Sequence, residues 1–575
     1  MNEGAILHIP NSQFCFPIGE KEIVLRIRVS NEDNFKNLWV VHGYKYDYSF
    51  KREEAKMDIK YRDRLYSYYE IKLKVADVRF AYIFKIEEEG RILYYSEDGI
   101  SESYDFKQSF YNFFQLPYIN KADLFETVDW MRNAVFYQIF IDRFKRGDWE
   151  KDGSYINMQW GEIPNPKSFA GGDLKGIGEK LDYLKSLGIT AIYLTPLFES
   201  VSNHKYDTID YKKVDSQFGS NEVLKELIEE IHNRGMKIVL DAVFNHCSMY
   251  MKEFQDVLEK GKASKYFNWF LIDGDKPDID EMNYQCFASC NYMPKLNTSN
   301  PEVQKFLLNI TSYWTTEFQI DGWRLDVSDE VSHDFWRAFR KEVKRINKSC
   351  VIIGENWHDA YPYLMGDQYD SIMNYSFTKA ALDFFAKEAL NSKEMAERLN
   401  SLLMRNKEQV NRMMLNLLDS HDTHRFFTEV KKDKDKVLAA LAIEMVYLGA
   451  PCIYYGTEIA LEGGYDPDSR RCFNWDEEQW DKEFMERIRE LTSLRALKEV
   501  GFGDISIYEE NNLLCLKRSH EGKTLLLLIN NTDEAVELNA ISSFKKRSSV
   551  ELLAKNNIQG FKIGSKGYVA IRLED

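Results

Sequence analysis

Apolar and polar residues alternate along the N-terminal fifth of the chain. Residues 23–29 carry an apolar side chain at every second position, and residues 70–75 repeat that pattern. Period-two alternation is typical of strands that bury one face, and no long helical pattern interrupts it here. We therefore predict an N-terminal β-sandwich over residues 1–122.

A different pattern begins near Trp130, where short apolar runs alternate with amphipathic helical segments. Eight such runs lie at 134–140, 190–194, 237–242, 320–326, 351–354, 371–374, 413–418 and 451–455. Their nearly continuous apolar character is expected of strands buried on both faces. Eight strands separated by helices predict a parallel (β/α)8 TIM barrel, which we assign to residues 123–246 and 298–498.

Two segments fall outside this repeat. The gap between the third and fourth runs is about twice the usual strand–helix unit, so we predict an inserted domain at 247–297. After Leu497 the two-residue alternation returns, as in 524–529, and predicts a C-terminal β-sandwich over 499–575. The predicted fold class is α/β: a TIM barrel with an inserted domain, flanked by two β-sandwiches.

Composition narrows the function classes. The formal net charge of −16 opposes the phosphate contacts on which nucleic-acid binding depends, and no apolar run is long enough for a signal peptide or a membrane span. The eight cysteines are scattered, and Cys286 and Cys290 lack the second pair that a zinc site needs. We expect free thiols, a cytoplasmic protein, and neither a nucleic-acid nor a membrane partner.

Charged and imidazole side chains follow four of the eight runs at the points where they end. These residues are Asp241, Asn245 and His246, then Arg324 and Asp326, then Glu355, and finally His421 and Asp422. A single residue of this kind is usually a turn or cap residue. Four such endings on one rim of a barrel, where carboxyl groups repel one another, favour an active site instead.

The spacing of these residues suggests their chemistry. Arg324 and Asp326 lie two apart on one strand and share a face, so the guanidinium favours the ionised form that a nucleophile needs. Glu355 ends the next strand and would act as a protonated acid. Carboxyl groups about 5 Å apart would give a retaining glycosidase. Asp422 would grip sugar hydroxyls and favour ring distortion.

These four segments resemble the conserved regions of the α-amylase family, glycoside hydrolase family thirteen, over nearly the whole chain. The resemblance implies that the insertion is the family's domain B. It also implies three catalytic roles: Asp326 as nucleophile, Glu355 as acid/base and Asp422 as transition-state stabiliser. By the same match His246 and His421 bind hydroxyls of the substrate sugar. The roles of the other residues of the rim follow from this match as well. Asp241 and Asn245 support Arg324 and domain B, and Asp241 and Arg324 count among the substrate-binding residues.

A finer resemblance points to the neopullulanase, cyclomaltodextrinase and maltogenic amylase subgroup. Residues 293–297, Met-Pro-Lys-Leu-Asn, resemble its fifth region. Residues 326–330, Asp-Val-Ser-Asp-Glu, resemble its Asp-Val-Ala-Asn-Glu stretch, and Glu330 matches an acceptor-side glutamate. The N-terminal sandwich resembles the starch-binding-like module that this subgroup uses in dimer contacts, so we expect a homodimer.

Three further contacts follow from this resemblance. In residues 354–360, where Asn356 replaces the usual Ile, Trp357 stacks on the acceptor sugar. Tyr206, in a loop similar to the one after the family's second strand, forms a platform for the sugar being cleaved. Asp466 and Arg470, in a loop like the one after the eighth strand, reach the non-reducing end of the substrate. A solvated ion pair is the alternative for these last two residues.

One stretch departs from the subgroup. Its calcium pattern Asn-Gly-Asp-x-x-Asn-Asp is matched here by residues 146–152, in which Arg146 and Lys151 replace two neutral ligands. Calcium requires six to eight oxygen ligands. The oxygens left for a degenerate site belong to Asp148, Asp152, Asp173 and the Gly171 carbonyl. We predict that Arg146 or Lys151 takes the ion's place, so that the chain needs no cofactor.

The resulting hypothesis is a hydrolase of α-glucosidic bonds, mainly α-1,4, in cyclodextrins, pullulan and short maltodextrins. It works through a covalent glycosyl-enzyme intermediate, which leaves transfer to a sugar acceptor open. One alternative is a trehalose synthase-like or other transglycosylase of the same family. Another is a non-catalytic glucan-binding barrel, which would be expected to have lost a member of the trio Asp326, Glu355 and Asp422.

Overall fold

The computed structural model describes residues 1–47, 52–88, 90–104, 112–538, 541 and 550–574. The chain forms two compact units. The first comprises Met1–Thr127, Leu390–Asn411 and Ser506–Lys517, and the second comprises Val128–Ala389, Arg412–Ile505 and Arg518–Asp575. None of the helices in the described ranges is long and apolar enough to cross a membrane.

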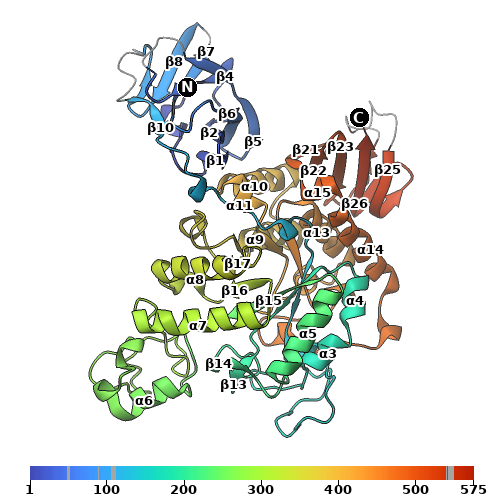
Figure 1. The fold of residues 1–575 in the computed structure, drawn as a ribbon. Coiled ribbons are helices and arrows are strands. Elements are labelled where there is room, and N and C mark those ends of the chain that lie inside the picture. Colours follow the sequence, from blue (N-terminus) through green and yellow to red (C-terminus); the bar gives the residue numbers. More distant parts are fainter. Residues whose placement is uncertain (48–51, 89, 105–111, 539–540, 542–549, 575) are drawn as a thin grey trace. The chain divides into compact units, whose positions relative to one another are not determined.

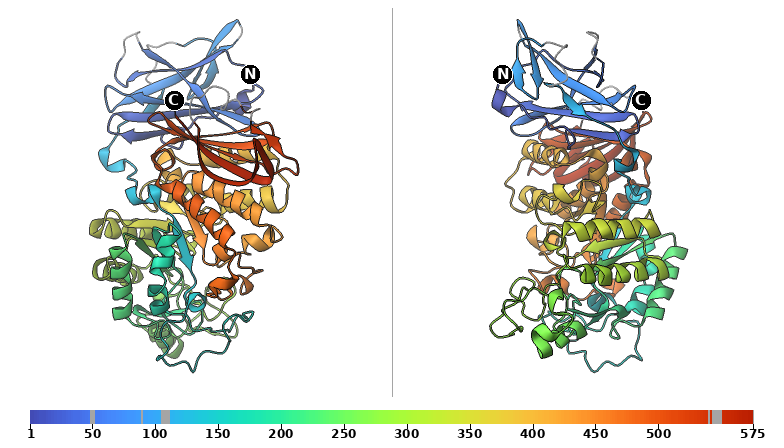
Figure 2. Two further views of the ribbon diagram at one scale, coloured as in Figure 1. Left: turned by 90° about the vertical axis from the view of Figure 1, so that its right-hand side faces the viewer. Right: turned by 60° about the vertical axis from the view of Figure 1, so that its left-hand side comes forward.

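The N-terminal part of the first unit is a β-sandwich (Figures 1 and 2). One sheet has the order β1-β2-β6-β5, and the other has the order β4-β3-β7-β8-β9 with β10 paired to β7. Apolar side chains of β2 and β7 meet in one shared core, as the alternating pattern predicted. The strands are β1 (Cys15–Gly19), β2 (Glu22–Ser30), β3 (Asn37–Tyr44), β4 (Glu53–Lys56), β5 (Asp58–Arg62), β6 (Tyr66–Lys74), β7 (Phe80–Glu88), β8 (Arg91–Ser96), β9 (Gly99–Ser101) and β10 (Phe114–Leu116).

The second unit is built on a parallel barrel. Its sheet has the order β18-β17-β16-β15-β12-β11-β20-β19, and a parallel bridge between Met373 and Leu415 joins the two ends. Seven of the eight predicted runs contain one strand each, and the eighth, 451–455, overlaps a strand that begins one residue earlier, so the predicted barrel is confirmed. The strands are β11 (Phe136–Ile139), β12 (Ala191–Leu194), β15 (Lys237–Ala242), β16 (Gly322–Leu325), β17 (Val351–Gly354), β18 (Ser371–Ile372), β19 (Leu415–Leu417) and β20 (Ala450–Tyr454).

Helices connect these strands (Figure 1). In α5 the Ser220 side chain accepts a hydrogen bond from Val223 N, and the apolar face of the helix is buried against the barrel. The main helices of this unit are α2 (Ile141–Phe144), α3 (Leu174–Gly178), α4 (Leu181–Ser186), α5 (Asn221–Asn233), α7 (Pro301–Glu317), α8 (His333–Ile346), α9 (Tyr375–Ala381), α12 (Phe426–Glu429), α13 (Lys434–Val446), α14 (Lys482–Ser493) and α15 (Lys498–Gly501). Helices α10 (Ser392–Met404) and α11 (Glu408–Asn411) belong to the first unit.

Two excursions leave the barrel at the ends of its strands. After β12 the chain forms a small antiparallel sheet of β13 (Phe198–Ser200) and β14 (Thr208–Val214). After β15 it forms the predicted insertion, which contains α6 (Lys252–Lys260) and returns through an antiparallel bridge between His246 and Lys295. This bridge places the end of the insertion at the rim of the barrel. The exact domain boundaries stay predictions.

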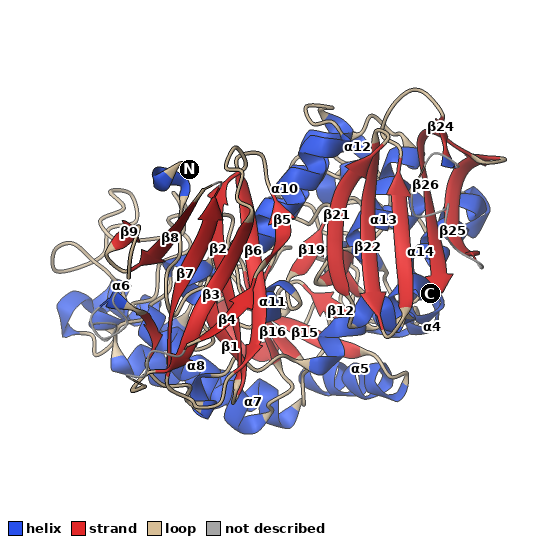
Figure 3. Cartoon of the chain, turned by 90° about the horizontal axis from the view of Figure 1, so that it is seen from above, coloured by secondary structure: helices blue, strands red, loops and turns tan. Residues whose placement is uncertain are grey.

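The C-terminal strands form one six-stranded sheet of order β21-β22-β23-β26-β24, with β25 paired to β26. Helices α13 and α14 contact strands β25 and β26 of this sheet, and Figure 3 shows them behind its strands. The predicted fold class, a TIM barrel flanked in sequence by β domains, is confirmed. The strands are β21 (Asp504–Glu510), β22 (Leu513–His520), β23 (Lys523–Ile529), β24 (Val536–Glu537), β25 (Val550–Gln559) and β26 (Lys562–Glu574).

Candidate active site

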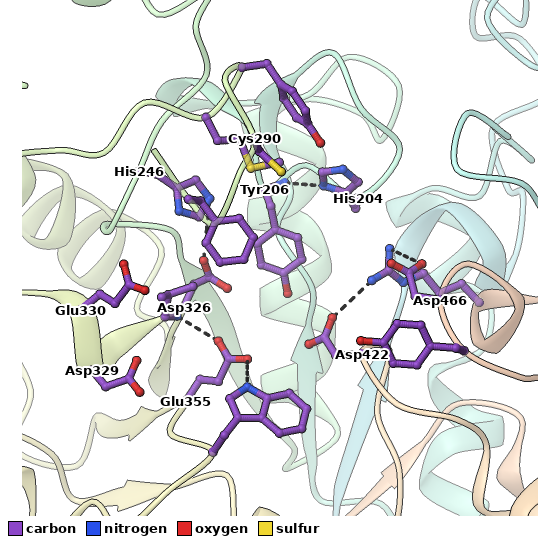
Figure 4. A pocket seen from close by; sticks show the side chains of 17 residues that line it. His204, Tyr206, His246, Cys290, Asp326, Asp329, Glu330, Glu355, Asp422 and Asp466 are labelled. Atoms are coloured by element: carbon purple, nitrogen blue, oxygen red, sulfur yellow. Dashed lines mark hydrogen bonds and ion pairs between the residues drawn. The ribbon is translucent and has the colours of Figure 1, made fainter. Parts of the chain in front are cut away.

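A cavity of about 520 Å³ opens at the carboxyl ends of the barrel strands (Figure 4). Nine of the residues predicted from the sequence line it: Tyr206, His246, Asp326, Glu330, Glu355, Trp357, Asp422, Asp466 and Arg470. Four others are buried around the cavity and bond residues that line it: Asp241, Asn245, Arg324 and His421. The rim predicted from four strand ends is therefore one site.

Arg324 lies at the centre of the acidic cluster. The register of the strands places it beside Asp241 of β15, and its Nη1 lies 3.1 Å from both oxygens of that carboxyl group. The same Nη1 donates to Asp326 Oδ1 at 2.8 Å, and Nη2 lies 2.9 Å from Glu355 Oε2. The order β15-β16-β17 therefore brings three carboxyl groups to one guanidinium.

Burial dominates the electrostatics of this cluster. It raises the pKa of Asp326 and Glu355 above their ordinary values and that of Asp241 to about 6, while Arg324 opposes the rise in all three. Three carboxyl groups around one cation would leave excess negative charge in a buried site if all were ionised. Burial therefore makes the cluster hold protons to higher pH than isolated carboxyl groups would. Since Arg324 contacts Glu355 as closely as Asp326, this contact alone does not make Asp326 the ionised member.

Besides Arg324 Nη2, which has the ion pair with Glu355, two buried polar atoms of residues that line the cavity have no hydrogen-bond partner among the described residues. They are Nε2 of His246 and Oδ2 of Asp326, which lie 4.0 Å apart. The imidazole stacks on Phe287 with ring centroids 4.9 Å apart, and burial lowers the pKa of His246 to about 3, so the ring is neutral. An unpaired buried polar atom costs about 1–3 kcal/mol, which a ligand hydroxyl between the two would recover.

Tyr206 and His421 form a second wall of the site. Their rings lie parallel, 5.6 Å apart with an interplanar angle of 7°, and Tyr206 Oη lies 2.6 Å from His421 Nε2. Gln138 Nε2 donates to His421 Nδ1 at 2.8 Å, so the proton of this imidazole is on Nε2. That nitrogen lies 3.1 Å from Asp422 Oδ2 and holds this carboxyl group toward the cavity.

Arg470 links the third carboxyl group of the trio to the loop after β20. Its Nη2 lies 3.2 Å from Asp422 Oδ1, and its Nη1 lies 3.0 Å from Asp466 Oδ1. The predicted pair of Asp466 and Arg470 is thus an ion pair, and both of its members line the cavity. The contact of Asp466 and Arg470 with the non-reducing end of the substrate stays a prediction.

Glu330 and Trp357 also line the cavity. Lys295, at the end of the insertion, bonds Asn245 Oδ1 and also lies 3.0 Å from Glu330 Oε2. The indole of Trp357 lies flat on Tyr375, with ring centroids 3.7 Å apart, and its Nε1 donates to Glu355 Oε1 at 3.2 Å. The side chain of Trp357 remains 46% exposed, which leaves a free aromatic face.

Several cavity residues were not predicted from the sequence. His204 accepts a hydrogen bond from Tyr206 N at its Nδ1, 3.1 Å away, so its Nε2 carries the proton. Burial lowers the pKa of His204 to about 3. Tyr292 and Tyr465 line the cavity as exposed aromatic residues. His204 and Tyr465 stand in the loops that suggested Tyr206 and Asp466, and their position beside these residues was the only available signal.

In the stretch that departs from the calcium pattern, the ammonium group of Lys151 lies among three oxygen atoms. Lys151 Nζ lies 2.8 Å from Gly171 O, 2.8 Å from Gln217 O and 2.9 Å from Asp173 Oδ2. Asp148 Oδ2 pairs with a lysine 3.2 Å away, and Asp152 accepts two bonds from Ser154. Within the described ranges no group of three or more His, Cys, Asp or Glu side chains is arranged to hold a metal ion. In this arrangement the oxygens of Asp148, Asp152, Asp173 and Gly171 are bonded to donors of the chain itself.

A cavity lined by clustered carboxyl groups at the carboxyl ends of the strands is typical of TIM-barrel enzymes, and this chain has such a cavity. Residues 138–492 match the family described as alpha amylase, catalytic domain, and residues 1–120 match the alpha amylase N-terminal ig-like domain. The chain therefore belongs to the α-amylase family.

Individual relatives refine this assignment. The cyclomaltodextrinase of Thermoanaerobacter pseudethanolicus is 41% identical over 94% of this chain and 95% of its own length. The intracellular maltogenic amylase of Bacillus subtilis is 38% identical over 92% of this chain and 91% of its own length. A solved cyclomaltodextrinase structure has a TM-score of 0.93 at 35% identity and covers 100% of both chains. Neopullulanase is the name of another relative, so the predicted family and subgroup of α-glucan hydrolases are confirmed.

Proposed function

We propose that the chain is a retaining glycosidase with Asp326 as nucleophile and Glu355 as general acid and base. The Asp326 carboxylate attacks the anomeric carbon while Glu355 gives its proton to the departing glycosidic oxygen. Glu355 then takes a proton from a water molecule that hydrolyses the glycosyl-enzyme ester. The observation that carries this proposal is that both carboxyl groups bond the terminal nitrogens of Arg324. Close neighbours of this kind suit a retaining enzyme, whose carboxyl groups lie about 5 Å apart.

The neighbouring side chains supply the contacts that the transition state needs. Asp422, held by His421 and Arg470, faces the cavity and would bind two sugar hydroxyls as the ring flattens. The unpaired atoms of His246 and Asp326 would close on a further hydroxyl. Tyr206 offers an aromatic face for the sugar that is cleaved.

The stereochemistry of the first product tests this mechanism. NMR of freshly released maltose or glucose should show the α-anomer before mutarotation, because two inversions retain configuration. Glu355→Gln should reduce kcat by about 10²–10⁴ and accumulate a covalent adduct on Asp326 with a glycosyl fluoride. Initial release of the β-anomer would show an inverting enzyme and reject the proposal.

We propose cyclodextrins, pullulan and short maltodextrins as substrates, cleaved mainly at α-1,4 bonds. Relatives named cyclomaltodextrinase, maltogenic amylase and neopullulanase support this, as do the exposed rings of Trp357, Tyr292 and Tyr465 around the cavity. Rates on β-cyclodextrin and soluble starch should differ in favour of cyclodextrin, and pullulan should yield panose. Faster cleavage of starch than of cyclodextrin would contradict this specificity.

Transfer to a sugar acceptor is a second activity that one contact favours. Lys295 holds Glu330, which lines the cavity as Trp357 does, and a leaving or incoming sugar would contact both residues. Incubation with maltotriose and excess glucose should give transfer products besides maltose. Trehalose formed from maltose would instead favour the trehalose synthase-like alternative, and a Glu355→Gln variant as active as the parent chain would favour the non-catalytic one.

We propose that no calcium is required, because Lys151 occupies the oxygen cluster with its own charge. A chelator should leave the melting temperature unchanged after dialysis. Stoichiometric calcium binding, together with destabilisation by the chelator, would reject this.

We also propose a cytoplasmic homodimer formed through the N-terminal domain. The name of the intracellular Bacillus subtilis relative supports the compartment, and the match to the family's N-terminal domain supports the dimer. Sedimentation equilibrium of the whole chain should give twice the monomer mass of 67.7 kDa. A monomer at all concentrations would reject the dimer.

A further inference from the structure

The residue after the proposed nucleophile has an unusual backbone conformation. Val327 has φ 44° and ψ 46°, in the left-handed region, which is unfavourable for a β-branched side chain. This conformation directs Val327 N toward the next strand end, where it donates to Glu355 Oε2 at 2.9 Å. Strained backbone of this kind persists when the surrounding structure holds it, and it gathers at functional sites.

Ser328 is the residue that holds the turn. It is fully buried, and its Oγ lies 2.8 Å from the backbone carbonyl of Glu355 and 3.0 Å from Asn356 Oδ1. Its own carbonyl accepts hydrogen bonds from Trp336 Nε1 at 2.8 Å and from Tyr369 Oη at 2.9 Å. The residue is therefore anchored on both its side chain and its backbone.

These bonds join two loops beyond the last paired residues of their strands. Strands β16 and β17 are paired up to Leu325 and Gly354, and Glu355 N still donates to Leu325 O at 3.0 Å. Past that point, Val327 N and the Ser328 hydroxyl connect the loop that follows Asp326 to the segment that carries Glu355. Arg324, whose terminal nitrogens lie 2.8 Å from Asp326 Oδ1 and 2.9 Å from Glu355 Oε2, also links the two carboxyl groups.

We propose that Ser328, together with Asn356, is a positioning residue that holds the left-handed turn at Val327, so that the backbone amide of Val327 orients the Glu355 carboxyl group against Asp326. This inference rests on the proposed retaining mechanism. It predicts that the Ser328 hydroxyl affects the chemical step and the proton affinity of Glu355, although Ser328 does not line the cavity.

Several charged and polar groups influence the pKa of Glu355, so the effect of the Val327 amide on the pH profile must be distinguished from their effects. Arg324 lies on β16, Asp422 follows β19, and Asp241, Asp326 and Tyr375 also interact with this carboxyl group electrostatically. Trp357 donates to its other oxygen. The Val327 amide favours the ionised form, and its loss would raise the pKa of Glu355 while the other groups stay in place. Because the acid must be protonated, the alkaline limb of kcat/KM would move to higher pH.

Ser328→Ala is the direct test. We expect kcat to fall about 10- to 100-fold with KM within about twofold, because small displacements of a catalytic group have effects of this size. The alkaline limb of kcat/KM should move upward by about half a pH unit or more as the hydrogen bond from Val327 weakens. Ser371→Ala is the matched control: Ser371 is a fully buried serine of the neighbouring strand β18, whose hydroxyl lies 3.4 Å from the carbonyl of Ile372.

The double variant Ser328→Ala with Asn356→Leu guards against simple misfolding, because it also removes the Asn356 amide oxygen that Ser328→Ala alone leaves without this hydrogen bond. Only the backbone carbonyl of Glu355 then loses its bond to the hydroxyl. It should melt close to the parent chain and still show the reduced kcat and the displaced limb. Wild-type kcat and an unmoved limb in both Ser328 variants would overturn the inference. A reduced kcat with an unmoved limb would also overturn it, since that indicates a packing role.

The proposed function fails on a different observation. Initial release of the β-anomer by the parent chain would reject the retaining mechanism whatever Ser328→Ala does. Release of the α-anomer with an inactive Glu355→Gln, combined with a Ser328→Ala variant that matches the parent chain, would reject only the positioning role.

Discussion

The N-terminal sandwich and the barrel each contain a buried arginine, and the two guanidinium groups have different sets of partners. Arg26 of β2 is 2% exposed and Arg324 of β16 is 1% exposed. Arg26 Nε bonds Glu70 Oε2 at 2.8 Å, and its Nη1 donates to two backbone carbonyls. Arg324 instead faces three carboxyl groups and leaves the site with more negative than positive charge.

Two buried histidines repeat the contrast. In the sandwich, His8 Nδ1 lies 2.6 Å from Arg26 O and Nε2 lies 2.8 Å from Tyr82 Oη, so both ring nitrogens are partnered. In the barrel, His246 Nε2 is buried without a partner among the described residues. Pairing of both His8 ring nitrogens stabilises the folded sandwich. The unpaired His246 nitrogen costs folding free energy that a hydrogen bond with a ligand would recover.

The largest expected effect is on activity, from Asp326→Asn. Loss of the nucleophile should reduce kcat by about 10⁴–10⁶. The melting temperature should not fall, because the change relieves excess negative charge around Arg324. Steady-state kinetics and thermal unfolding measure the two effects, with Asp182→Asn on α4, whose side chain is 84% exposed, as the control. A large loss of stability would show that the carboxyl cluster is structural, as in the sandwich.

The reverse result is expected for Glu70→Gln in the sandwich. Removing one partner leaves the Arg26 charge buried, which costs about 3–5 kcal/mol. Denaturant unfolding should show this loss while kcat is unchanged. Glu54→Gln, which breaks the more exposed pair with Lys85, should cost about 1 kcal/mol or less. If the Glu70→Gln chain is as stable as the parent, the Arg26–Glu70 pair does not stabilise the sandwich, and the sandwich and the barrel do not differ in this respect.

The pH dependence of stability should reveal His8. Burial lowers the pKa of His8 to about 4 in the folded chain, so between pH 6.5 and 4 the unfolded chain binds more protons. Stability from this group therefore falls as pH falls through that window. The difference in unfolding free energy between the parent chain and His8→Gln should shrink by about 2 kcal/mol from pH 7 to pH 5. A constant difference would mean that His8 titrates alike in both states.

The smallest effect is expected at the edge of the cavity, from Lys295→Met. Loss of the pair with Glu330, whose side chain is 51% exposed, should lower kcat/KM by about fivefold, which corresponds to about 1 kcal/mol. The ratio of transfer to hydrolysis should fall with it, as measured by product chromatography with glucose as acceptor. An unchanged ratio would indicate that Glu330 needs no anchoring.

Much of the fold was predictable because its signals are local. Period-two alternation predicted the sandwich strands, and each of the eight apolar runs overlaps a barrel strand such as β15, whose bounds match the predicted run 237–242. The acidic rim was predictable too, since a polar residue that ends a buried strand points to one end of the barrel. The notable failure was His204, which no periodicity distinguishes from other loop histidines.

Other features depended on which atoms meet across the barrel. The sequence left Arg146 and Lys151 equally able to replace calcium. In the structure Lys151 bonds the oxygen cluster, while the guanidinium of Arg146 lies 4.5 Å from the ring centre of Trp149. Similarly, the sequence placed Arg324 beside Asp326 and the family resemblance implied support from Asp241, whereas the strand register brought Glu355 to the same guanidinium.

The sequence by itself determined the strands, their order along the chain, the α-amylase resemblance and the candidates Asp326, Glu355 and Asp422. These follow from residue spacing within single segments, which short-range geometry governs. The tertiary structure decided how the carboxyl groups of Asp241, Asp326 and Glu355 share protons and the Arg324 guanidinium. It also decided that Val327 adopts a left-handed backbone conformation. The physical reason is that burial and hydrogen bonding between strands set these properties, and both exist only once the barrel has closed.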